Sequence, residues 1–285
     1  MTKEPARVGA VTDRQNGPEL VVVRDLDAIA ADAAGRIATA LADAVAVRGR
    51  ADWATTGGSV APGVYRRLAA PPLRDAIPWP EVHVWWGDDR YVPRDDPLSN
   101  VKPLDDILLS IALTEGGQLG LGMSGTPAPV ALSLDNLHPF PTTIAIGAAR
   151  GAAWCAAELA AELKVAGLEQ RAGWPVFDLV LVGVGPDGHV LSVFPGSPAL
   201  ESGDLAMAIP APTHVEPHVE RVTLNPAVLR VARHVLVAAG GASKAAVLAA
   251  IFGPERDPGR WPAQLALRDG ATWIVDSAAS EYIGR

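Results

Sequence analysis

The stretch FDLVLVGVGPDGHVLSVFPGSPAL, residues 177–200, decides the predicted fold. An apolar run at its start, residues 177–182, has the length and composition of a buried strand. The run stops at residues 183–189, a glycine-rich segment that contains one proline, one acid and one imidazole. Glycine and proline at this density indicate a tight turn, so the pattern predicts a buried strand that presents Asp187 and His189 at its carboxyl end.

The same arrangement recurs along the chain. A short apolar strand precedes a polar or glycine-rich turn at residues 51–59, 82–100 and 235–244 as well. Helical segments lie between the strands, and residues 25–47 and 147–167 are the longest. This alternation predicts an α/β fold, a doubly wound, mostly parallel sheet with helices on both faces, Rossmann-like and forming a single domain. Ligands bind such sheets at the carboxyl ends of the strands, so we expect the turns to converge on one edge.

Other segments are less regular. Residues 1–18 are polar and contain proline and glycine, which predicts a flexible tail ahead of one domain at 19–285. Residues 105–113 have the composition of a short helix, and residues 114–143 predict an irregular connection. Further short strands are expected at residues 205–209, 221–224 and 272–275.

Composition excludes several classes of partner. The 285 residues are 49% hydrophobic and carry a formal net charge of −8, without a run of lysine or arginine. Nucleic acid binding needs clustered cations, so we expect no nucleic acid partner. No segment has the apolar length of a membrane span, and the N-terminal stretch lacks the apolar core of a secretory signal. We therefore expect a cytoplasmic protein that binds no membrane. We also expect a monomer, although composition does not decide the oligomeric state.

The glycines at positions 183, 185 and 188 match the GxGxxG spacing of dinucleotide sites. That fingerprint needs a helix that begins at the turn, because its N–H groups hold the pyrophosphate. Pro186 lies inside this turn, and the Pro195–Pro198 segment leaves no room for a long helix after it. We therefore expect no NAD or FAD site.

The acid and the imidazole of this turn suit acid–base chemistry. Histidine titrates near neutral pH, and Asp187 could orient or polarise the ring of His189 to take a proton from water. A turn in which the aspartate only caps backbone N–H groups is the alternative. No metal site is predicted, because Pro217 between His214 and His218 excludes a helical i,i+4 ligand pair.

Glycines and cations elsewhere suggest an anion site. Residues 56–59, Thr-Gly-Gly-Ser, resemble a cradle in which backbone N–H groups and the start of a helix face an anion. Lys244 follows another glycine pair at a helix start and offers a cation, although a solvated lysine is the commoner case. Arg221 and Arg90 are open to the same two interpretations.

Taken together and in this order, these motifs resemble those of the 6-phosphogluconolactonases of the glucosamine/galactosamine-6-phosphate isomerase superfamily. The matching segments, within about residues 20–252, are Thr56–Ser59, Trp86–Pro93, Ser99–Asn100, Gly183–His189, Phe194–Gly196, Arg221–Thr223 and Gly240–Ala245. Two departures stand out. Asp89 replaces the usual glutamate, which leaves its role open, and Val190, Leu191 and Val193 replace threonine, alanine and leucine.

The resemblance implies hydrolysis of 6-phospho-D-glucono-1,5-lactone to 6-phosphogluconate, the second step in the oxidative branch of the pentose phosphate pathway, with no metal and no cofactor. It implies that His189 is the general base that activates water, with Asp187 as its polar neighbour and Arg90 near the substrate's oxygens. Contacts to the sugar phosphate are implied for Gly57, Gly58, Ser59, Asp88, Asn100, Arg221 and Lys244.

Two alternatives remain open. The deaminase/isomerase branch, which acts on glucosamine 6-phosphate, resembles this chain in its phosphate turn but has Asp-Glu-Tyr at residues 88–90, where this chain has Asp-Asp-Arg. Arg90 keeps its proton at any working pH, so it suits an anionic substrate better than a proton shuttle. The second alternative is a sugar-phosphate-binding module without catalysis, which gives no reason for the His189 turn.

Overall fold

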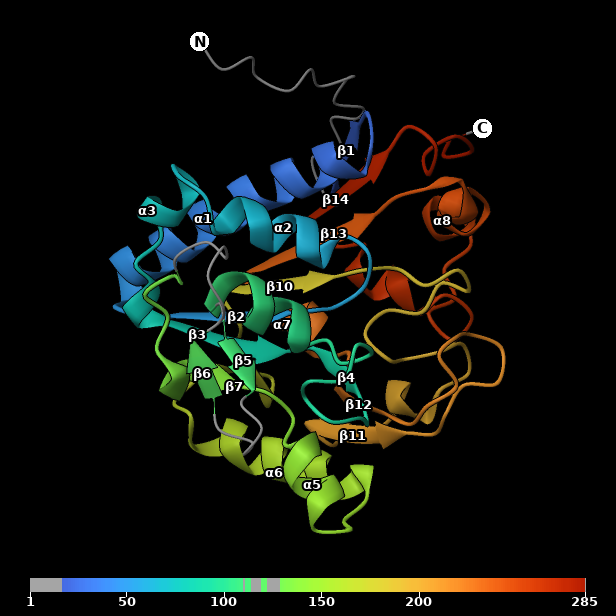
Figure 1. Ribbon diagram of the computed structural model, residues 1–285. Coiled ribbons are helices and arrows are strands. Elements are labelled where there is room, and N and C mark those ends of the chain that lie inside the picture. Colours follow the sequence, from blue (N-terminus) through green and yellow to red (C-terminus); the bar gives the residue numbers. More distant parts are fainter. Residues whose placement is uncertain (1–16, 110, 114–118, 122–128, 285) are drawn as a thin grey trace.

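Seven strands form one parallel sheet in the spatial order β1-β14-β13-β10-β2-β3-β7 (Figure 1). The computed structural model describes residues 17–109, 111–113, 119–121 and 129–284. The strands of the main sheet are β1 Glu19–Val23, β2 Ala51–Thr55, β3 Val82–Trp86, β7 Leu137–His138, β10 Leu179–Val182, β13 His234–Ala239 and β14 Ala271–Asp276.

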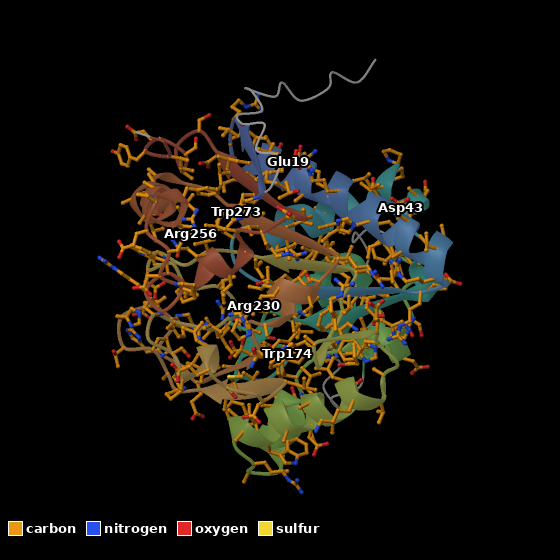
Figure 2. All side chains as sticks on the ribbon, turned by 180° about the vertical axis from the view of Figure 1, so that it is seen from behind. Glu19, Asp43, Trp174, Arg230, Arg256 and Trp273 are labelled. Atoms are coloured by element: carbon orange, nitrogen blue, oxygen red, sulfur yellow. The ribbon has the colours of Figure 1, made fainter. Side chains whose placement is uncertain are left out.

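Both faces of the sheet are covered, which explains the continuous apolar runs. Every residue of β2 and β10 is buried, as parallel strands between two helical layers require. Helices α1 (Leu26–Arg48) and α2 (Ala61–Leu68) pack together on one face. The other face, turned to the viewer in Figure 2, carries α7 (Val228–Val231) with the labelled Arg230. The predicted doubly wound α/β sheet is therefore confirmed.

Helix α1 has the ends that its sequence predicts. The side chain of Asp25 accepts a hydrogen bond from the backbone N–H of Ala28 at 2.9 Å, which caps the start. Gly49 ends the helix in the left-handed conformation, with φ of 73°. The helix thereby lies rigidly across β2, β10, β13 and β14.

The order of the strands reverses between β2 and β10. From β2 the chain continues to β3 on one side, whereas from β10 it continues to β13 and β14 on the other. Connections that diverge in this way leave a crevice at the carboxyl ends of the two strands. The turns at residues 56–60 and 183–189 leave the sheet at this point.

A second, antiparallel sheet adjoins the end of β3. It has the order β11-β12-β4, from β11 (Ala206–Ile209), β12 (Arg221–Leu224) and β4 (Asp88–Arg90). The strands expected at 205–209 and 221–224 are thus present, but outside the main sheet. Strand β4 lies within the polar segment after β3, and it places Arg90 directly opposite Arg221.

Two predicted helices have different bounds. The predicted helix at 105–113 ends at Leu109, because residues 111–113 form β5 and pair with β6 (Leu119–Leu121). The predicted helix at 147–167 begins only at Ala152, because Ala149 has φ of 52° and Gly151 is extended. The predicted tail, as far as residue 16, and much of the 114–143 connection lie outside the described residues.

The remaining described elements are short, apart from α6. They are α3 Leu73–Ala76, α4 Lys102–Leu104, the π-helical turn Asp105–Leu109, α5 Thr142–Gly147, α6 Ala152–Val165, β8 Gln170–Arg171, β9 Trp174–Pro175 and α8 Ala245–Phe252, with 3-10 turns at Trp79–Glu81, Leu134–Asn136, Pro198–Leu200, Ala242–Lys244 and Pro262–Ala266. Within the described parts of the chain, no helix is long and apolar enough to cross a membrane.

Candidate active site

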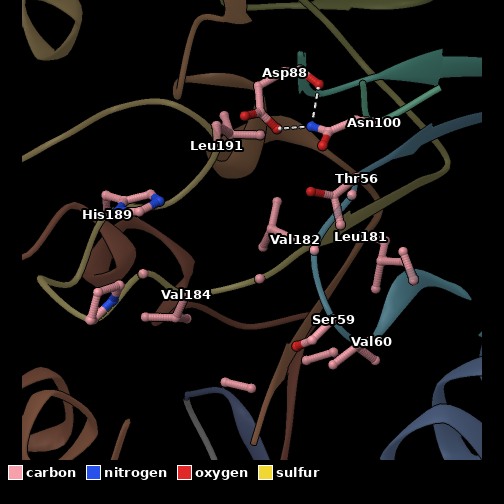
Figure 3. Close-up of a pocket in the computed structure, with 18 of the residues that line it drawn as sticks. Thr56, Ser59, Val60, Asp88, Asn100, Leu181, Val182, Val184, His189 and Leu191 are labelled. Atoms are coloured by element: carbon pink, nitrogen blue, oxygen red, sulfur yellow. Dashed lines mark hydrogen bonds between the residues drawn. The ribbon is translucent and has the colours of Figure 1, made fainter. Parts of the chain in front are cut away.

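A pocket of about 240 Å³ lies at the carboxyl edge of the main sheet (Figure 3). The turns after β2, β3, β10 and β13 all reach it, as expected for parallel strands. In Figure 3, Thr56, Ser59, His189 and the hydrogen-bonded pair of Asp88 and Asn100 surround one space. Of the ten residues predicted for the site, Gly57, Gly58, Ser59, Asp88, Arg90, Asn100, His189, Arg221 and Lys244 line this pocket.

The tenth predicted residue, Asp187, lies behind His189. Its Oδ1 accepts a hydrogen bond from Nδ1 of His189 at 2.6 Å and from the backbone N–H of His189 at 3.1 Å. Because an ionised carboxylate only accepts hydrogen bonds, this contact places the ring proton on Nδ1. Nε2 of His189 keeps its lone pair, and it has no hydrogen-bond partner among the described residues.

Glycine is required at two positions of this turn. A Cβ at residue 185 would lie 1.9 Å from Nδ1 of His189, so only glycine leaves room for the ring. Gly188 has φ of +86°, and its N–H donates to the carbonyl of Gly185 at 3.1 Å, which closes the turn. Gly185 and Gly188 therefore serve the placement of an imidazole.

Asp187 stays ionised at the pH where enzymes work. Burial acts to raise its pKa, but the hydrogen bonds from His189 and His214 outweigh burial and hold the pKa of this carboxyl well below its usual range. Asp187 is thus too weak a base to take a proton from the His189 ring. It orients the ring and stabilises its charged form.

Three cations enter the pocket without a carboxylate partner. Arg90 donates to the carbonyl of Leu98 at 2.6 Å, and Arg221 donates to the carbonyl of Pro217 at 2.9 Å. Neither they nor Lys244 form an ion pair with any carboxylate that the structure describes. These charges are therefore available to an anion.

The surroundings of Arg221 and Lys244 disfavour their charged forms. Burial lowers the pKa of Arg221, and the neighbouring charge of Arg90, its cross-strand partner, lowers it further. Burial also lowers the pKa of Lys244, against the attraction of Asp187. Like charges on opposing strands repel each other. A bound anion would relieve both effects.

Hydrogen-bond acceptors lie in the same pocket lining as these cations. Asp88 is 5% exposed and accepts from Oγ of Ser192 at 2.6 Å. The amide of Asn100 donates to the backbone carbonyl of Asp88 at 2.9 Å, and the two dashed lines in Figure 3 mark its bonds to that residue. Oδ1 of Asn100 is buried without a partner, and a Cβ at Gly57 would lie 1.9 Å from it. A sugar hydroxyl suits such a group.

Asp89, whose role the sequence left open, does not line the pocket. It is fully buried and accepts hydrogen bonds from the backbone N–H groups of Arg90 and Asn100 and from Oγ of Ser99. Burial raises its pKa to about 7, despite these donors. Its side chain fastens the 99–100 segment to β4 and so holds Asn100 in position.

Four residues near the site escape prediction from sequence. Leu191 and Glu216 line the pocket, Ser192 holds Asp88, and His214 holds Asp187. Ser192 lies between Leu191 and Val193, two of the departures from the family pattern. His214 lies in a proline-rich loop without any regular pattern. The part of the chain that the structure describes contains no group of three or more potential metal ligands.

Comparison with known proteins agrees with this geometry. Residues 24–274 match the profile of the family described as glucosamine-6-phosphate isomerases/6-phosphogluconolactonase. The chain is 32% identical over 269 residues to the 6-phosphogluconolactonase of Streptomyces coelicolor, covering 94% of this chain and 95% of the relative. It is 34% identical over 260 residues to that of Mycobacterium tuberculosis, covering 90% and 94%.

Solved structures have the same fold. The 6-phosphogluconolactonase of Trypanosoma brucei superposes with a TM-score of 0.74 at 26% identity and covers 93% of this chain and 98% of its own. A monomeric glucosamine-6-phosphate deaminase superposes with a TM-score of 0.68 at 15% identity, which shows a shared fold alone. By its sequence and its fold, the chain belongs to the glucosamine-6-phosphate isomerase/6-phosphogluconolactonase family.

Proposed function

We propose that this chain is a 6-phosphogluconolactonase, which hydrolyses 6-phospho-D-glucono-1,5-lactone to 6-phosphogluconate without a metal ion. One observation carries the proposal: His189, with Nδ1 held by Asp187, opens into the same pocket as three cations that have no carboxylate partner among the described residues. A base beside an anion site suits a substrate that combines a hydrolysable carbonyl with a phosphate.

The phosphate would bind to Lys244, Arg221 and the Gly58–Ser59 turn, all of which line the pocket. Gly58 has φ of +83°, a conformation that lets a backbone turn approach a ligand closely. A buried cation that meets a phosphate exchanges its desolvation cost for a charge-assisted hydrogen bond. This anchoring leaves the lactone ring to reach His189.

In the reaction, water attacks C1 of the lactone while Nε2 of His189 takes its proton. The carbonyl oxygen becomes an oxyanion, which Arg90 is suited to stabilise. The C1–O5 bond then breaks, and the imidazolium returns the proton to O5, which becomes the C5 hydroxyl. Asp187 remains ionised throughout, because its hydrogen bonds keep its pKa low.

General-base assistance contributes about 10²–10⁴-fold. That range is sufficient for a δ-lactone, which is already a reactive ester. Asp88 and Asn100 would orient the sugar hydroxyls, since their polar atoms face the pocket from the wall of β4. We propose the domain bounds 19–285 for this activity, with residues 1–18 as a tail and with the enzyme acting as a cytoplasmic monomer.

The deciding experiment is a hydrolysis assay with freshly made 6-phosphogluconolactone, corrected for its spontaneous opening. We expect turnover well above the uncatalysed rate, and no change after treatment with a chelator. Faster release of ammonia from glucosamine 6-phosphate would instead support the deaminase branch. Binding of 6-phosphogluconate without any turnover of the lactone would support a binding module.

A further inference from the structure

His214 makes a contact beside the base that the proposed mechanism does not use. It lies in the segment between β11 and β12, and its Nε2–H donates to Oδ2 of Asp187 at 2.8 Å. Since His189 occupies Oδ1, each oxygen of this carboxylate carries one imidazole. The two rings therefore share a single negative charge.

The ring of Phe194 packs against both imidazoles. Its ring is 7% exposed and lies 4.7 Å from the ring of His189, centroid to centroid, and 5.7 Å from that of His214. The contact with His214 is edge to face, a preferred geometry for ring pairs. The His214 side chain, 52% exposed, is thus fixed by a hydrogen bond and by a ring contact.

The loop that carries His214 also reaches the anion site. The carbonyls of Pro217 and Val219 accept hydrogen bonds from the guanidinium of Arg221. Val215 and Glu216, which follow His214 directly, line the pocket. One loop therefore touches both halves of the site, the base and the cation that we assign to the phosphate.

The charges around Asp187 are few. Its carboxylate faces the imidazoles of His189 and His214, and it attracts the ammonium of Lys244. On the loop of His214, Oε1 of Glu216 lies 3.1 Å from Nε2 of His218, so these two side chains pair with each other. Asp187 is therefore the nearest negative charge to both rings, and the way its charge is divided governs how strongly His189 holds a proton.

We propose that His214 is a positioning residue: its Nε2–H locks the carboxylate of Asp187 against His189 and weakens the hold of Asp187 on the imidazolium. This inference rests on the proposed role of His189 as a base. A carboxylate that donates electron density into two hydrogen bonds stabilises each partner less than it would stabilise one. The base is therefore aimed accurately and also releases its proton more readily.

Two variants separate these effects. His214→Ala removes the N–H, so the carboxylate can rotate and keeps a side-chain hydrogen bond to the His189 ring only. His214→Gln keeps an amide N–H at the same distance from Cα. His234→Ala serves as the control. His234 is exposed at the amino end of β13, whereas the pocket lies at the carboxyl ends of the strands.

For His214→Ala we expect kcat to fall about 10-fold with KM within about twofold, as for other residues that orient a reacting group. The NMR titration midpoint of the His189 ring should move up by about 0.5 pH units or more. In this variant the carboxylate of Asp187 no longer shares its charge with a second imidazole, so it stabilises the charged form of His189 more strongly. The acid limb of the pH–rate profile should move in the same direction. His214→Gln should recover most of kcat and the midpoint.

The inference fails if His214→Ala leaves kcat and the His189 midpoint at their wild-type values, or if His214→Gln loses as much as His214→Ala. A shift of equal size in His234→Ala would also contradict it. The NMR titration needs no substrate. If the wild-type protein does not hydrolyse the lactone, the proposed function fails, while the titration still decides whether His214 tunes His189.

Discussion

Charged side chains at the two edges of the main sheet differ in their partners. At the amino edge, Nη2 of Arg48 lies 2.6 Å from Oδ1 of Asp178. Nη2 of Arg50 lies 2.7 Å from Oδ1 of Asp52. Arg233 approaches Asp178 at 3.1 Å. Each of these arginines has a carboxylate within the protein. Their charges are satisfied in the fold itself, which indicates a role in stability.

At the carboxyl edge, the two arginines of the pocket, Arg90 and Arg221, donate only to backbone carbonyls among the described residues. Arg90 and Arg221 even lie opposite each other on paired strands. Folding alone does not reward such an arrangement, because like charges on opposing strands repel. The comparison indicates that the paired charges at the amino edge stabilise the sheet. The cations of the pocket, which have no carboxylate partner among the described residues, are instead placed to bind an anionic ligand. Five experiments test this distinction.

The largest effect is expected for His189→Ala. Loss of the base should lower kcat by about 10²–10⁴-fold, while binding of 6-phosphogluconate stays close to normal, because the cations remain. Steady-state kinetics and calorimetric titration with the product measure the two quantities. Near-normal turnover would refute the role of His189.

Next comes Asp178→Asn, at the amino edge. It removes the carboxylate partner that Arg48 has among the described residues, whereas Arg233 keeps Glu169, and we expect a loss of about 3 kcal/mol in the free energy of unfolding. KM and kcat should not change at temperatures where the variant is folded. Denaturant unfolding and kinetics test this. An altered KM with intact stability would reverse the assignment of the two edges.

Gly185→Ala should damage catalysis without loss of the fold. The new methyl group would overlap the ring of His189, so the imidazole must move, and we expect kcat to fall on the order of 100-fold. Gly183→Ala is the matched control in the same turn, since its Cβ would meet only the Ala238 carbonyl, at 3.9 Å. Equal losses in both variants would mean that the turn, not the ring, is at fault.

Asp89→Asn tests the buried carboxyl beside the site. Burial raises the pKa of Asp89 from 3.8 to about 7, so the folded state prefers the protonated form. The resulting stability is complete below about pH 4 and is lost as the pH rises through about 7. Asparagine does not titrate, so relative to wild type the variant should gain about 2 kcal/mol between pH 5 and pH 7. Thermal unfolding across this range gives the difference, and parallel curves would contradict the raised pKa.

The smallest effect is expected for Lys244→Ala. The loss of one of several phosphate contacts should raise KM about 10-fold and leave kcat within about twofold. Melting temperatures should be unchanged without ligand, since Lys244 has no ion pair among the described residues. A loss confined to kcat would argue against a phosphate contact.

Much of this arrangement could be predicted from the sequence, because it depends on local patterns. Apolar runs such as residues 179–182 and the glycine turns after them fix the strands and their carboxyl ends. Parallel pairing then brings the turns to one edge, so that Ser59, His189 and Lys244 line one pocket.

What could not be predicted depends on pairing between distant segments. Strand β4 has three charged residues and no alternation of polar and apolar side chains, so nothing local shows that Arg90 faces Arg221. The contact between His214 and Asp187 joins two turns through a loop without regular structure. The break before Ala152 depends on one residue with positive φ, Ala149, which no residue preference reveals.

The adjacency of β2 and β10 has a consequence for how the protein folds. Trp53 pairs with Leu179, so the Thr56–Ser59 turn and His189 belong to strands that are neighbours in space and far apart along the chain. Such non-local pairings close large loops, and they form slowly. A partly folded chain that has β2 and β3 but not β10 has no pocket. The ligand therefore recognises only molecules in which this central pairing is complete, and by mass action it draws the population toward them.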